Sequence, residues 1–411
     1  MGRWDIFCMV VDNYGDIGTC WRLAQQLADE HDVDVRLWVD QLSHLARLCP
    51  AVSADADQQL VGGIEIRCWR CDFPQVEAAD VVIEAFACEL PESYIAAMAR
   101  RAVAPVWINL EYLSAEAWVE GCHRLSSPRT KWPLTKHFFF PGFTLRTGGL
   151  LRERDLLADR AAFASAAEAE FWRSVGVPAR SDDELRVSLF CYQNASLPGL
   201  LQCWADGPGA VTLLATPGPA ADQAAGWFGA PLLPGTPVRR SALTAYALPF
   251  LPQAEFDRLL WACDVNFVRG EDSFVRAQWA GRPFVWQIYP QAEDAHLIKL
   301  EAFLERYLDR FEQFAVVRRF WHAWNAGGPI ACDSTANPWH GLPAREMRHG
   351  QDARATVTTS CQETWPHTMA SAWRDFAAHR RAIERHGKAW VNALDQRGDL
   401  AHNLLMFALN L

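Results

Sequence analysis

The sequence of 411 residues has no apolar run that approaches the ~18 to 20 residues needed to span a bilayer. Its first five residues, Met1 to Asp5, include an acid where a signal peptide would have basic and then apolar residues. Basic residues are not in excess either, because 39 Lys and Arg stand against 49 Asp and Glu, for a net charge of -10. Such a charge repels a phosphate backbone. We therefore expect a cytoplasmic protein with no membrane and no nucleic-acid partner.

Several common catalytic motifs are also missing. There is no GxxxxGK[ST] loop, no HExxH and no GxSxG, so the sequence lacks the motifs of nucleotide triphosphatases, zinc proteases and α/β-hydrolases. The one CxxC pair, Cys68 and Cys71, has no second pair at the spacing of zinc ligands. We interpret the twelve cysteines mainly as small packing residues.

Apolar runs alternate with segments of helical periodicity, which predicts parallel sheets with helical crossovers. The predicted strands are residues 5–11, 33–39, 64–69, 79–86 and 105–110, then 185–192, 211–216, 243–250, 264–268 and 283–287. The predicted helices are residues 21–27, 91–101, 153–174, 253–262, 272–280 and 295–308, with further helical pattern over 370–411. The Gly/Pro/Ala-rich residues 217–237 are predicted to form a loop or an irregular excursion.

A polar stretch follows Gly176 and Pro178 before the strand pattern restarts, so we place a domain boundary near residue 180. The sequence thus predicts an α/β protein with Rossmann-like domains at residues 1–180 and 181–365 and C-terminal helices at 366–411. In such sheets ligands bind beyond the carboxyl ends of the strands, where loops lead into helices. That rule directs attention to two loops.

The first loop follows the first predicted strand and contains Asp12, Asn13, Tyr14, Gly15 and Asp16. It is a poor dinucleotide motif, because the spacing is not GxGxxG and two carboxylates flank the glycine. Paired acids at a strand end suit a general base or a site that binds a cation. The alternative is structural: Asp16 caps the helix and Asp12 makes a turn hydrogen bond.

The second loop lies between predicted strand 264–268 and helix 272–280. Asp272 or Ser273 is a natural helix N-cap, Gly270 allows a tight turn, and Arg269 with the first helical amides suits a diphosphate. Glu271 is unexpected beside an anion, and we expect it to pair with a substrate cation, a sugar hydroxyl or Arg269. The alternative is a helix whose N-terminal acids complement its dipole.

Residues 4–18 and 267–291, read together with Phe190 to Tyr192 and residues 249–253, resemble the protein-arginine rhamnosyltransferases of bacterial elongation factor P, the EarP family. The resemblance spans nearly the whole chain in the same order. It implies a GT-B glycosyltransferase, with two Rossmann-like domains facing across a cleft and C-terminal helices packing back toward the N-terminal domain. It also implies a metal-independent, inverting transfer of L-rhamnose from dTDP-β-L-rhamnose to an arginine of elongation factor P, which activates the factor for rescue of polyproline-stalled ribosomes.

Carried onto this sequence, the resemblance implies that Asp12, Asp16 and Glu271 are catalytic and that no cofactor is needed beyond the donor substrate. Among these acids, we expect Asp16 to be the general base. The donor and acceptor would be bound by the remaining residues of the motifs, which are Asn13, Tyr14, Gly15, Phe190, Tyr192, Phe250, Gln253, Phe256, Arg269, Gly270, Asp272 and Ser273. Phe190, Phe250 and Phe256 would surround thymine, and Arg269 would neutralise the diphosphate.

The acceptor poses a chemical difficulty. Arginine has a pKa of ~13, so forming the neutral nucleophile in advance at pH 7 would cost about 8 kcal/mol. We therefore expect the acids to orient the guanidinium and to accept its proton as the new bond forms. Two other classes stay open from the residues: a GT-B enzyme with another nucleotide sugar or acceptor, and a noncatalytic nucleotide-binding protein.

Overall fold

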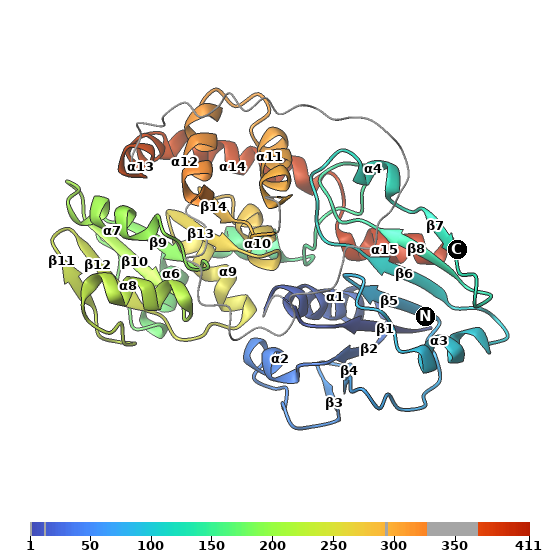
Figure 1. Ribbon diagram of the computed structural model, residues 1–411. Coiled ribbons are helices and arrows are strands. Elements are labelled where there is room, and N and C mark those ends of the chain that lie inside the picture. The colour runs from blue at the N-terminus through green and yellow to red at the C-terminus, as the bar shows by residue number, and fades with distance from the viewer. Residues whose placement is uncertain (1, 12–13, 292–294, 327–368) are drawn as a thin grey trace.

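The computed structural model describes residues 2–11, 14–291, 295–326 and 369–411, which form two α/β domains side by side (Figure 1). In the N-terminal domain eight strands form one sheet in the order β3-β4-β2-β1-β5-β6-β8-β7. The strands are β1 (Arg3–Cys8), β2 (Asp34–Val39), β3 (Gln58–Val61), β4 (Ile64–Cys68), β5 (Val81–Ala85), β6 (Val106–Leu110), β7 (Ser126–Pro128) and β8 (Thr135–Phe139). The central strands are parallel, and β3 and β7 pair antiparallel at the two edges.

Helices cover both faces of this sheet, because its central strands are apolar on both sides. They are α1 (Gly15–His31), α2 (Leu42–Leu48), α3 (Glu92–Ala99), α4 (Val119–Cys122) and the last helix of the chain, α15 (Leu400–Leu409). α1 and α15 share one core with the sheet, where Ile17 and Leu404 pack with Ile6. α3 packs on the opposite face, where Tyr94 joins Phe7.

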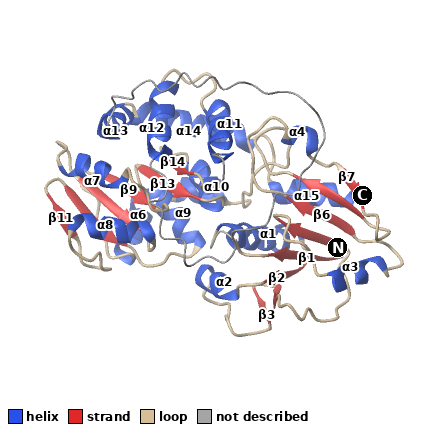
Figure 2. Cartoon of the chain, viewed as in Figure 1, coloured by secondary structure: helices blue, strands red, loops and turns tan. Residues whose placement is uncertain are grey.

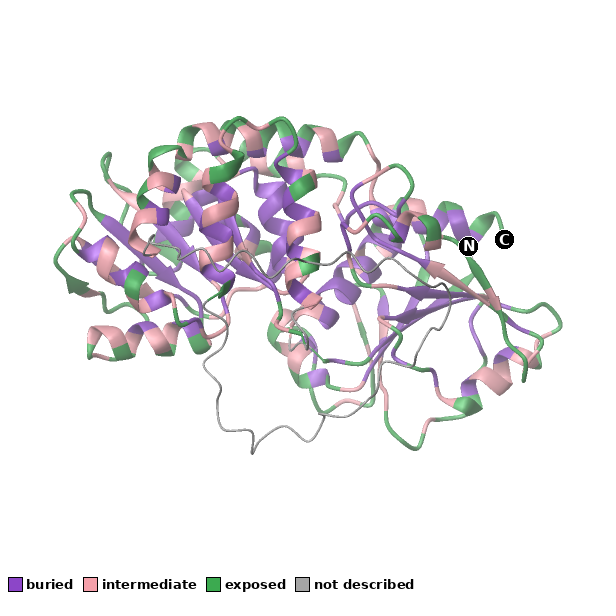
Figure 3. Ribbon diagram, turned by 45° about the horizontal axis from the view of Figure 1, so that its top comes forward, coloured by how far each residue is buried: buried purple, intermediate pink, exposed green. Residues whose placement is uncertain are grey.

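The C-terminal domain contains a six-stranded sheet in the order β11-β12-β10-β9-β13-β14. All its pairs are parallel except β11 with β12. The strands are β9 (Leu185–Leu189), β10 (Val211–Ala215), β11 (Val238–Arg240), β12 (Leu243–Ala247), β13 (Val265–Arg269) and β14 (Phe284–Gln287). Both sheets are buried between helices and loops (Figures 2 and 3).

The remaining helices pack on or beside this second sheet. They are α5 (Leu156–Ala162), α6 (Ser165–Ser174), α7 (Leu197–Ala205), α8 (Pro219–Phe228), α9 (Gln253–Ala262), α10 (Asp272–Ala280), α11 (Ala295–Tyr307), α12 (Phe314–Ala326), α13 (Met369–Ala378) and α14 (Arg380–Asp395). Two Rossmann-like domains that face each other form the GT-B architecture, so the predicted fold class is confirmed.

Within the described residues the chain passes between the domains twice, and the two passages lie side by side. The first lies between β8 and α5, and the second between α14 and α15. The Leu400 amide donates to the Leu150 carbonyl oxygen across 3.0 Å. The Gln26 side-chain amide bonds to both passages, at 2.8 Å from the Arg152 carbonyl oxygen and 3.0 Å from Asp399 Oδ1. The boundary at residue 180 stays a prediction, and the one at residue 365 lies outside the described residues.

Two predicted segments have a structure of a different kind. The single helix predicted over 153–174 is wrong, because the chain bends at Phe163 and Ala164 and forms α5 and α6. The bend allows the Phe163 ring to pack against Phe171 and Trp261, at centroid distances of 6.3 and 5.6 Å. This aromatic contact outweighs the helical pattern of the sequence.

The prediction that residues 217–237 form a loop is also wrong in part, because these residues include α8. Proline in the first turn of a helix is favourable, since its fixed φ is already helical and it has no amide hydrogen to lose. Pro219 occupies that first turn, and Gly229 ends the helix in a left-handed conformation. Pro219 and Gly229 are therefore the start and the end of a short alanine-rich helix.

Candidate functional site

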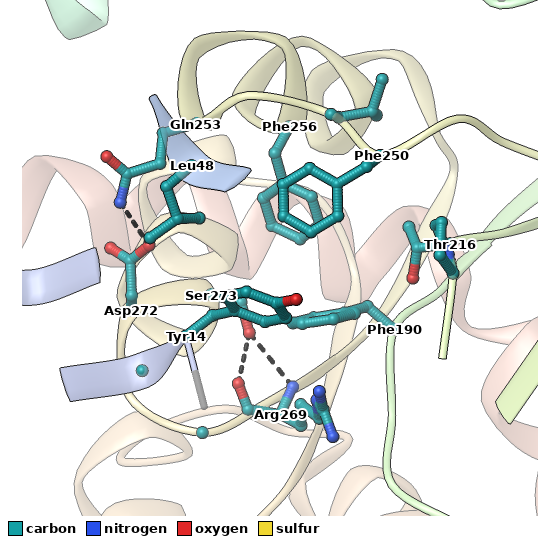
Figure 4. Close-up of a pocket in the computed structure, with 14 residues that line it drawn as sticks. Tyr14, Leu48, Phe190, Thr216, Phe250, Gln253, Phe256, Arg269, Asp272 and Ser273 are labelled. Carbon is teal, nitrogen blue, oxygen red and sulfur yellow. Dashed lines mark hydrogen bonds between the residues drawn. The ribbon is translucent and has the colours of Figure 1, made fainter. Parts of the chain in front are cut away.

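Two of the cavities between the domains share the lining residues Gly15 and Gly270. The first, called here the donor cavity, is lined by most of the residues predicted for substrate binding. These are Tyr14, Gly15, Phe190, Phe250, Gln253, Phe256, Arg269, Gly270, Asp272 and Ser273, joined by Leu48, Thr216, Pro217 and Leu251. Figure 4 shows the donor cavity.

Aromatic rings from both domains form the apolar part of the donor cavity. Phe190 and Phe256 meet edge to face at a centroid distance of 5.5 Å. Tyr14, from the N-terminal domain, meets Phe250 in the same way at 5.3 Å. The rings gather around one space (Figure 4). Such a cluster suits a planar base.

Arg269 supplies the positive charge of the donor cavity. It ends β13, and its guanidinium lies over the rings of Phe190 and Tyr192, 4.7 and 4.5 Å from their centroids. Tyr192 does not line the donor cavity itself, but it contacts Arg269, which does. The Tyr192 ring also contacts Tyr289. The predicted pairing of Glu271 with Arg269 is not among these contacts. The stacked guanidinium is well placed to neutralise an anion in the cavity.

The turn that follows Arg269 shapes the start of α10. Gly270 has a φ of +62°, in the left-handed region that favours glycine. The prediction that Asp272 or Ser273 caps α10 is wrong, because the N-cap position is Glu271 and no side chain caps it. Ser273 instead accepts from the Arg269 amide at 3.1 Å and donates to its carbonyl oxygen (Figure 4). The first amides of α10 are therefore not blocked by a capping side chain.

Asp272 contributes its charge to an ion network rather than to a cap. Arg22 of α1 lies 3.0 Å from Asp272 Oδ1 through Nε, and 2.9 Å from Glu153 through Nη1. Arg276 of α10 lies 2.6 Å from Glu153 and forms a two-pronged contact with Asp257, at 2.8 and 2.7 Å. We call these five residues the interdomain network. It joins α1 of one domain to α9 and α10 of the other.

Gly18 allows α1 and α10 to approach this closely. A Cβ atom at Gly18 would lie 3.1 Å from the Gln253 side-chain nitrogen and 3.2 Å from Asp272 Oδ2. Gln253 donates to the Gly18 carbonyl oxygen at 3.0 Å and to Asp272 at 3.2 Å. Gln253 and Asp272, both predicted to bind substrate, thus line the donor cavity while they also hold the two domains together.

The second cavity, called here the acceptor cavity, contains the predicted catalytic acids that the structure describes. Asp16 and Glu271 come from different domains and line it together with Tyr112, Leu113 and Lys299. Among the described residues of its lining, Lys299 alone is cationic. Asp12 and Asn13 lie outside the described residues. The structure therefore brings Asp16 and Glu271 to one space, adjacent to the donor cavity.

Asp16 is buried in the first turn of α1. The interpretation that Asp16 caps the helix is wrong, because the N-cap position is Tyr14 and no side chain caps it. Asp16 instead accepts from the Val11 amide at 2.8 Å, which fixes the carboxylate against the backbone that follows β1. Tyr112 lines the same cavity.

Glu271 has an environment that disfavours its charge. Burial, together with the nearby negative charge of Asp16, raises the pKa of Glu271 to about 8. The Leu113 amide opposes this effect by donating to Glu271 Oε2 at 2.9 Å, as does the charge of Lys299. A cation between Asp16 and Glu271 would favour the ionised form of both acids.

Tyr112, Leu113 and Lys299 were missed by the sequence analysis. Tyr112 and Leu113 follow the carboxyl end of β6, so the rule that ligands bind beyond strand ends could have identified them. Lys299 lies in the middle of α11, where no sequence signal distinguishes it from a surface lysine. Its place in the site depends on how α11 packs.

Comparisons with known proteins identify the family of the chain. The chain matches the family described as Elongation-Factor P (EF-P) rhamnosyltransferase EarP over residues 4–409. It is 51% identical over 350 residues to the protein-arginine rhamnosyltransferase of Pseudomonas aeruginosa, which covers 83% of this chain and 90% of the relative. It is 44% identical over 412 residues to that of Pseudomonas putida, covering 99% and 98%.

A solved structure is similar over its whole length. It concerns the structural basis for EarP-mediated arginine glycosylation of translation elongation factor EF-P, and it aligns with a TM-score of 0.64 and 32% identity, covering 100% of this chain and 99% of that chain. In the described part of the chain, no helix is long and apolar enough to cross a membrane. From the match over nearly its full length and the high identity to its relatives, the chain belongs to the EarP family of elongation factor P rhamnosyltransferases.

Proposed function

We propose that this protein transfers L-rhamnose from dTDP-β-L-rhamnose to one arginine guanidinium of elongation factor P in the cytoplasm, with inversion at the anomeric carbon and without a metal. Modification would activate the factor for rescue of ribosomes stalled on polyproline. The observation that carries the proposal is the position of Asp16 and Glu271 on one cavity that adjoins the donor cavity across Gly15 and Gly270. The names of the relatives support the acceptor and the sugar.

The donor would lie on the C-terminal domain. Phe190, Phe250 and Phe256 supply flat apolar surfaces for thymine. The diphosphate would lie near Arg269 and the first amides of α10, whose partial positive charge favours an anion. Arg22 offsets the negative charge of Asp272. The Asp272 carboxylate therefore repels the diphosphate less than an unpaired carboxylate would.

The acceptor guanidinium would lie between Asp16 and Glu271. One of its nitrogens attacks the anomeric carbon of rhamnose, and the bond from that carbon to the phosphate oxygen breaks. The electron pair of the broken bond leaves with dTDP, whose growing charge Arg269 and the α10 amides stabilise. The proton of the attacking nitrogen passes to Asp16, the general base. A single displacement of this kind inverts the β-configured donor carbon.

Intact-mass analysis of elongation factor P tests the proposal. Incubation with the enzyme and dTDP-β-L-rhamnose should add one deoxyhexose to the factor. An acceptor in which the target arginine is replaced by lysine should gain nothing. Replacing dTDP-rhamnose with dTDP-glucose in the assay tests whether the enzyme transfers a different sugar. Turnover with another donor or acceptor only, or binding of dTDP with no transfer from any donor, would contradict the proposal.

A further inference from the structure

The donor cavity is not formed by the C-terminal domain alone. Three of its lining residues, Tyr14, Gly15 and Leu48, belong to the N-terminal domain. The Tyr14 ring meets the Phe250 ring of the C-terminal domain at a centroid distance of 5.3 Å and an interplanar angle of 60° (Figure 4). Leu48 is the last residue of α2 and adds an apolar side chain to the lining. One wall of the expected base site therefore comes from the opposite domain.

One side of α2 supports the Tyr14 ring. Arg47 Nη1 donates to the Tyr14 hydroxyl oxygen at 3.1 Å. His44 precedes Arg47 by three residues, a spacing that puts both on one face of the helix. The centroid of the His44 ring lies 5.6 Å from that of Tyr14. The side of α2 that contributes Leu48 to the donor cavity thus also contacts Tyr14 through two further residues.

The contacts of α2 place Arg47 outside the cavity and Tyr14 between the two. Leu42 and Leu45 bury another side of the helix in the N-terminal core, which fixes α2 to its domain. Arg47 is exposed and does not line the donor cavity, so it reaches the cavity through the Tyr14 hydroxyl. Burial lowers the pKa of His44, so its ring is neutral at pH 7 and gives Tyr14 an uncharged surface.

The Tyr14 ring needs such support because the protein encloses it only in part. Tyr14 is half-buried, and it stands at the N-cap position of α1, where its side chain makes no capping hydrogen bond. A side chain that becomes ordered only when a ligand binds reduces the affinity for that ligand. A ring that is held in place beforehand avoids this loss. The hydrogen bond from Arg47 supplies a directional restraint on the hydroxyl end of the ring.

We propose that Arg47 is a positioning residue for the donor: through the Tyr14 hydroxyl it holds the Tyr14 ring beside Phe250, and so prepares the N-terminal wall of the base site. This inference rests on the proposed function, in which the donor is a nucleotide sugar. It adds a contribution of the N-terminal domain to donor affinity. The residue that makes it lies outside the cavity and contacts neither the sugar nor the catalytic acids.

The substitution Arg47→Met removes the hydrogen bond and keeps a long side chain. We expect the Kd for dTDP, measured by calorimetry, to rise by about 2- to 10-fold, the usual effect of ordering one side chain on binding. KM for dTDP-β-L-rhamnose should rise by a similar factor, and kcat at saturating donor should stay near the wild-type value, because the lost interaction contributes to binding rather than to the chemical step. Arg70→Met is the matched control, since it removes an exposed arginine of the same domain that pairs with Asp57.

A double-mutant cycle tests whether Arg47 acts through Tyr14. Tyr14→Phe removes the hydroxyl and keeps the ring, so it should weaken dTDP binding about as much as Arg47→Met does. The double variant should bind no more weakly than either single variant, because both changes break the same hydrogen bond. An Arg47 that bound the phosphates directly would instead weaken binding further in Tyr14→Phe, and more for dTDP than for dTMP. We expect equal factors for the two nucleotides.

The outcomes separate this inference from the proposed function. Wild-type affinity for dTDP in Arg47→Met would overturn the inference, as would additive losses in the double variant or a loss confined to thermal stability. Binding of dTDP by the wild type without transfer of rhamnose would contradict the proposed function alone, because the cycle requires only dTDP. A wild-type enzyme that does not bind dTDP would contradict both.

Discussion

Two glutamates at the interface, Glu153 in the interdomain network and Glu271 in the acceptor cavity, have pKa values that are shifted in opposite directions. In the interdomain network, burial would raise the pKa of Glu153, but Arg276 and Arg22 outweigh it and bring the value to about 2. In the acceptor cavity, burial and Asp16 raise the pKa of Glu271 to about 8. The residue type is the same, and the difference lies in whether arginine side chains accompany it.

The comparison indicates what the acceptor cavity lacks. The acids of the network are neutralised by arginines of the chain itself, so they serve cohesion between the domains. Asp16 and Glu271 have only the lysine side chain of Lys299 among the described cations of their cavity. An arginine of a substrate would supply there what Arg22 and Arg276 supply in the network. The acceptor cavity is thus suited to an incoming guanidinium.

The largest effect should come from removing an acid of the acceptor cavity. Asp16→Asn keeps the shape and removes the base, so transfer should fall on the order of 10²- to 10⁴-fold while dTDP binding stays nearly intact. Single-turnover assays and calorimetry with dTDP measure the two quantities. Asp40→Asn is a matched control, because Asp40 accepts from the neighbouring Val10 amide at 2.9 Å outside the cavity. Equal activity losses in the two variants would contradict the assignment.

Removing an arginine from the network should instead destabilise the fold. Arg276→Met leaves Glu153 and Asp257 without their main partner, and breaking a buried ion pair in this way costs about 3–5 kcal/mol. Urea denaturation measures the loss. Arg258→Met removes a half-exposed partner of Glu255 and should cost less than about 1 kcal/mol. Similar losses in both variants would show that burial of the network adds nothing to the free energy of unfolding.

The raised pKa of Glu271 predicts a pH dependence of stability. The folded protein holds the Glu271 proton more tightly than the unfolded chain, for which the ordinary pKa is 4.5. The resulting stabilisation is complete below pH 4.5 and is lost as the pH rises to about 8. Compared with Glu271→Gln, the wild type should lose stability on the order of a few kcal/mol across this range. Parallel curves for the two proteins would contradict the pKa assignment.

The smallest of these effects concerns the donor cavity. Arg269→Ala should weaken dTDP binding by about 1.5–3 kcal/mol, the usual contribution of a hydrogen bond to a charged group. Arg269→Lys keeps the charge without the planar guanidinium that stacks on Phe190 and Tyr192, so its affinity should be intermediate. Titration calorimetry measures both. An unchanged affinity in Arg269→Ala would exclude Arg269 from diphosphate binding.

Much of the fold could be predicted where local residues determine it. The bounds of α9 and α10 agree with the prediction, because proline precedes α9 and Gly281 ends α10 in a left-handed conformation. β8 was missed, since its residues are mostly half-buried and show no clear alternation. The single helix over 153–174 failed at Phe163, whose contact with Trp261 joins residues far apart in the sequence.

The candidate site also contains residues that the local sequence identifies and partners that it does not. Asp16, Glu271 and Arg269 could be identified because acids and a cation at strand ends beside glycines are visible in the sequence. Their partners could not, since nothing local connects Arg22 with Asp272, or Leu113 with Glu271. The capping role expected for Asp272 failed for this reason, because the distant Arg22 competes with the helix end for the same carboxylate.

The adjacent passages of the chain between the domains have a mechanical consequence. Because Leu150 and Leu400 are hydrogen-bonded to each other, the two passages between the domains that the structure describes meet in one small region. Two rigid bodies joined at a single region rotate about it more easily than they separate. We expect any opening of the enzyme to be a rotation about this axis, which would widen the cleft most at the side farthest from it.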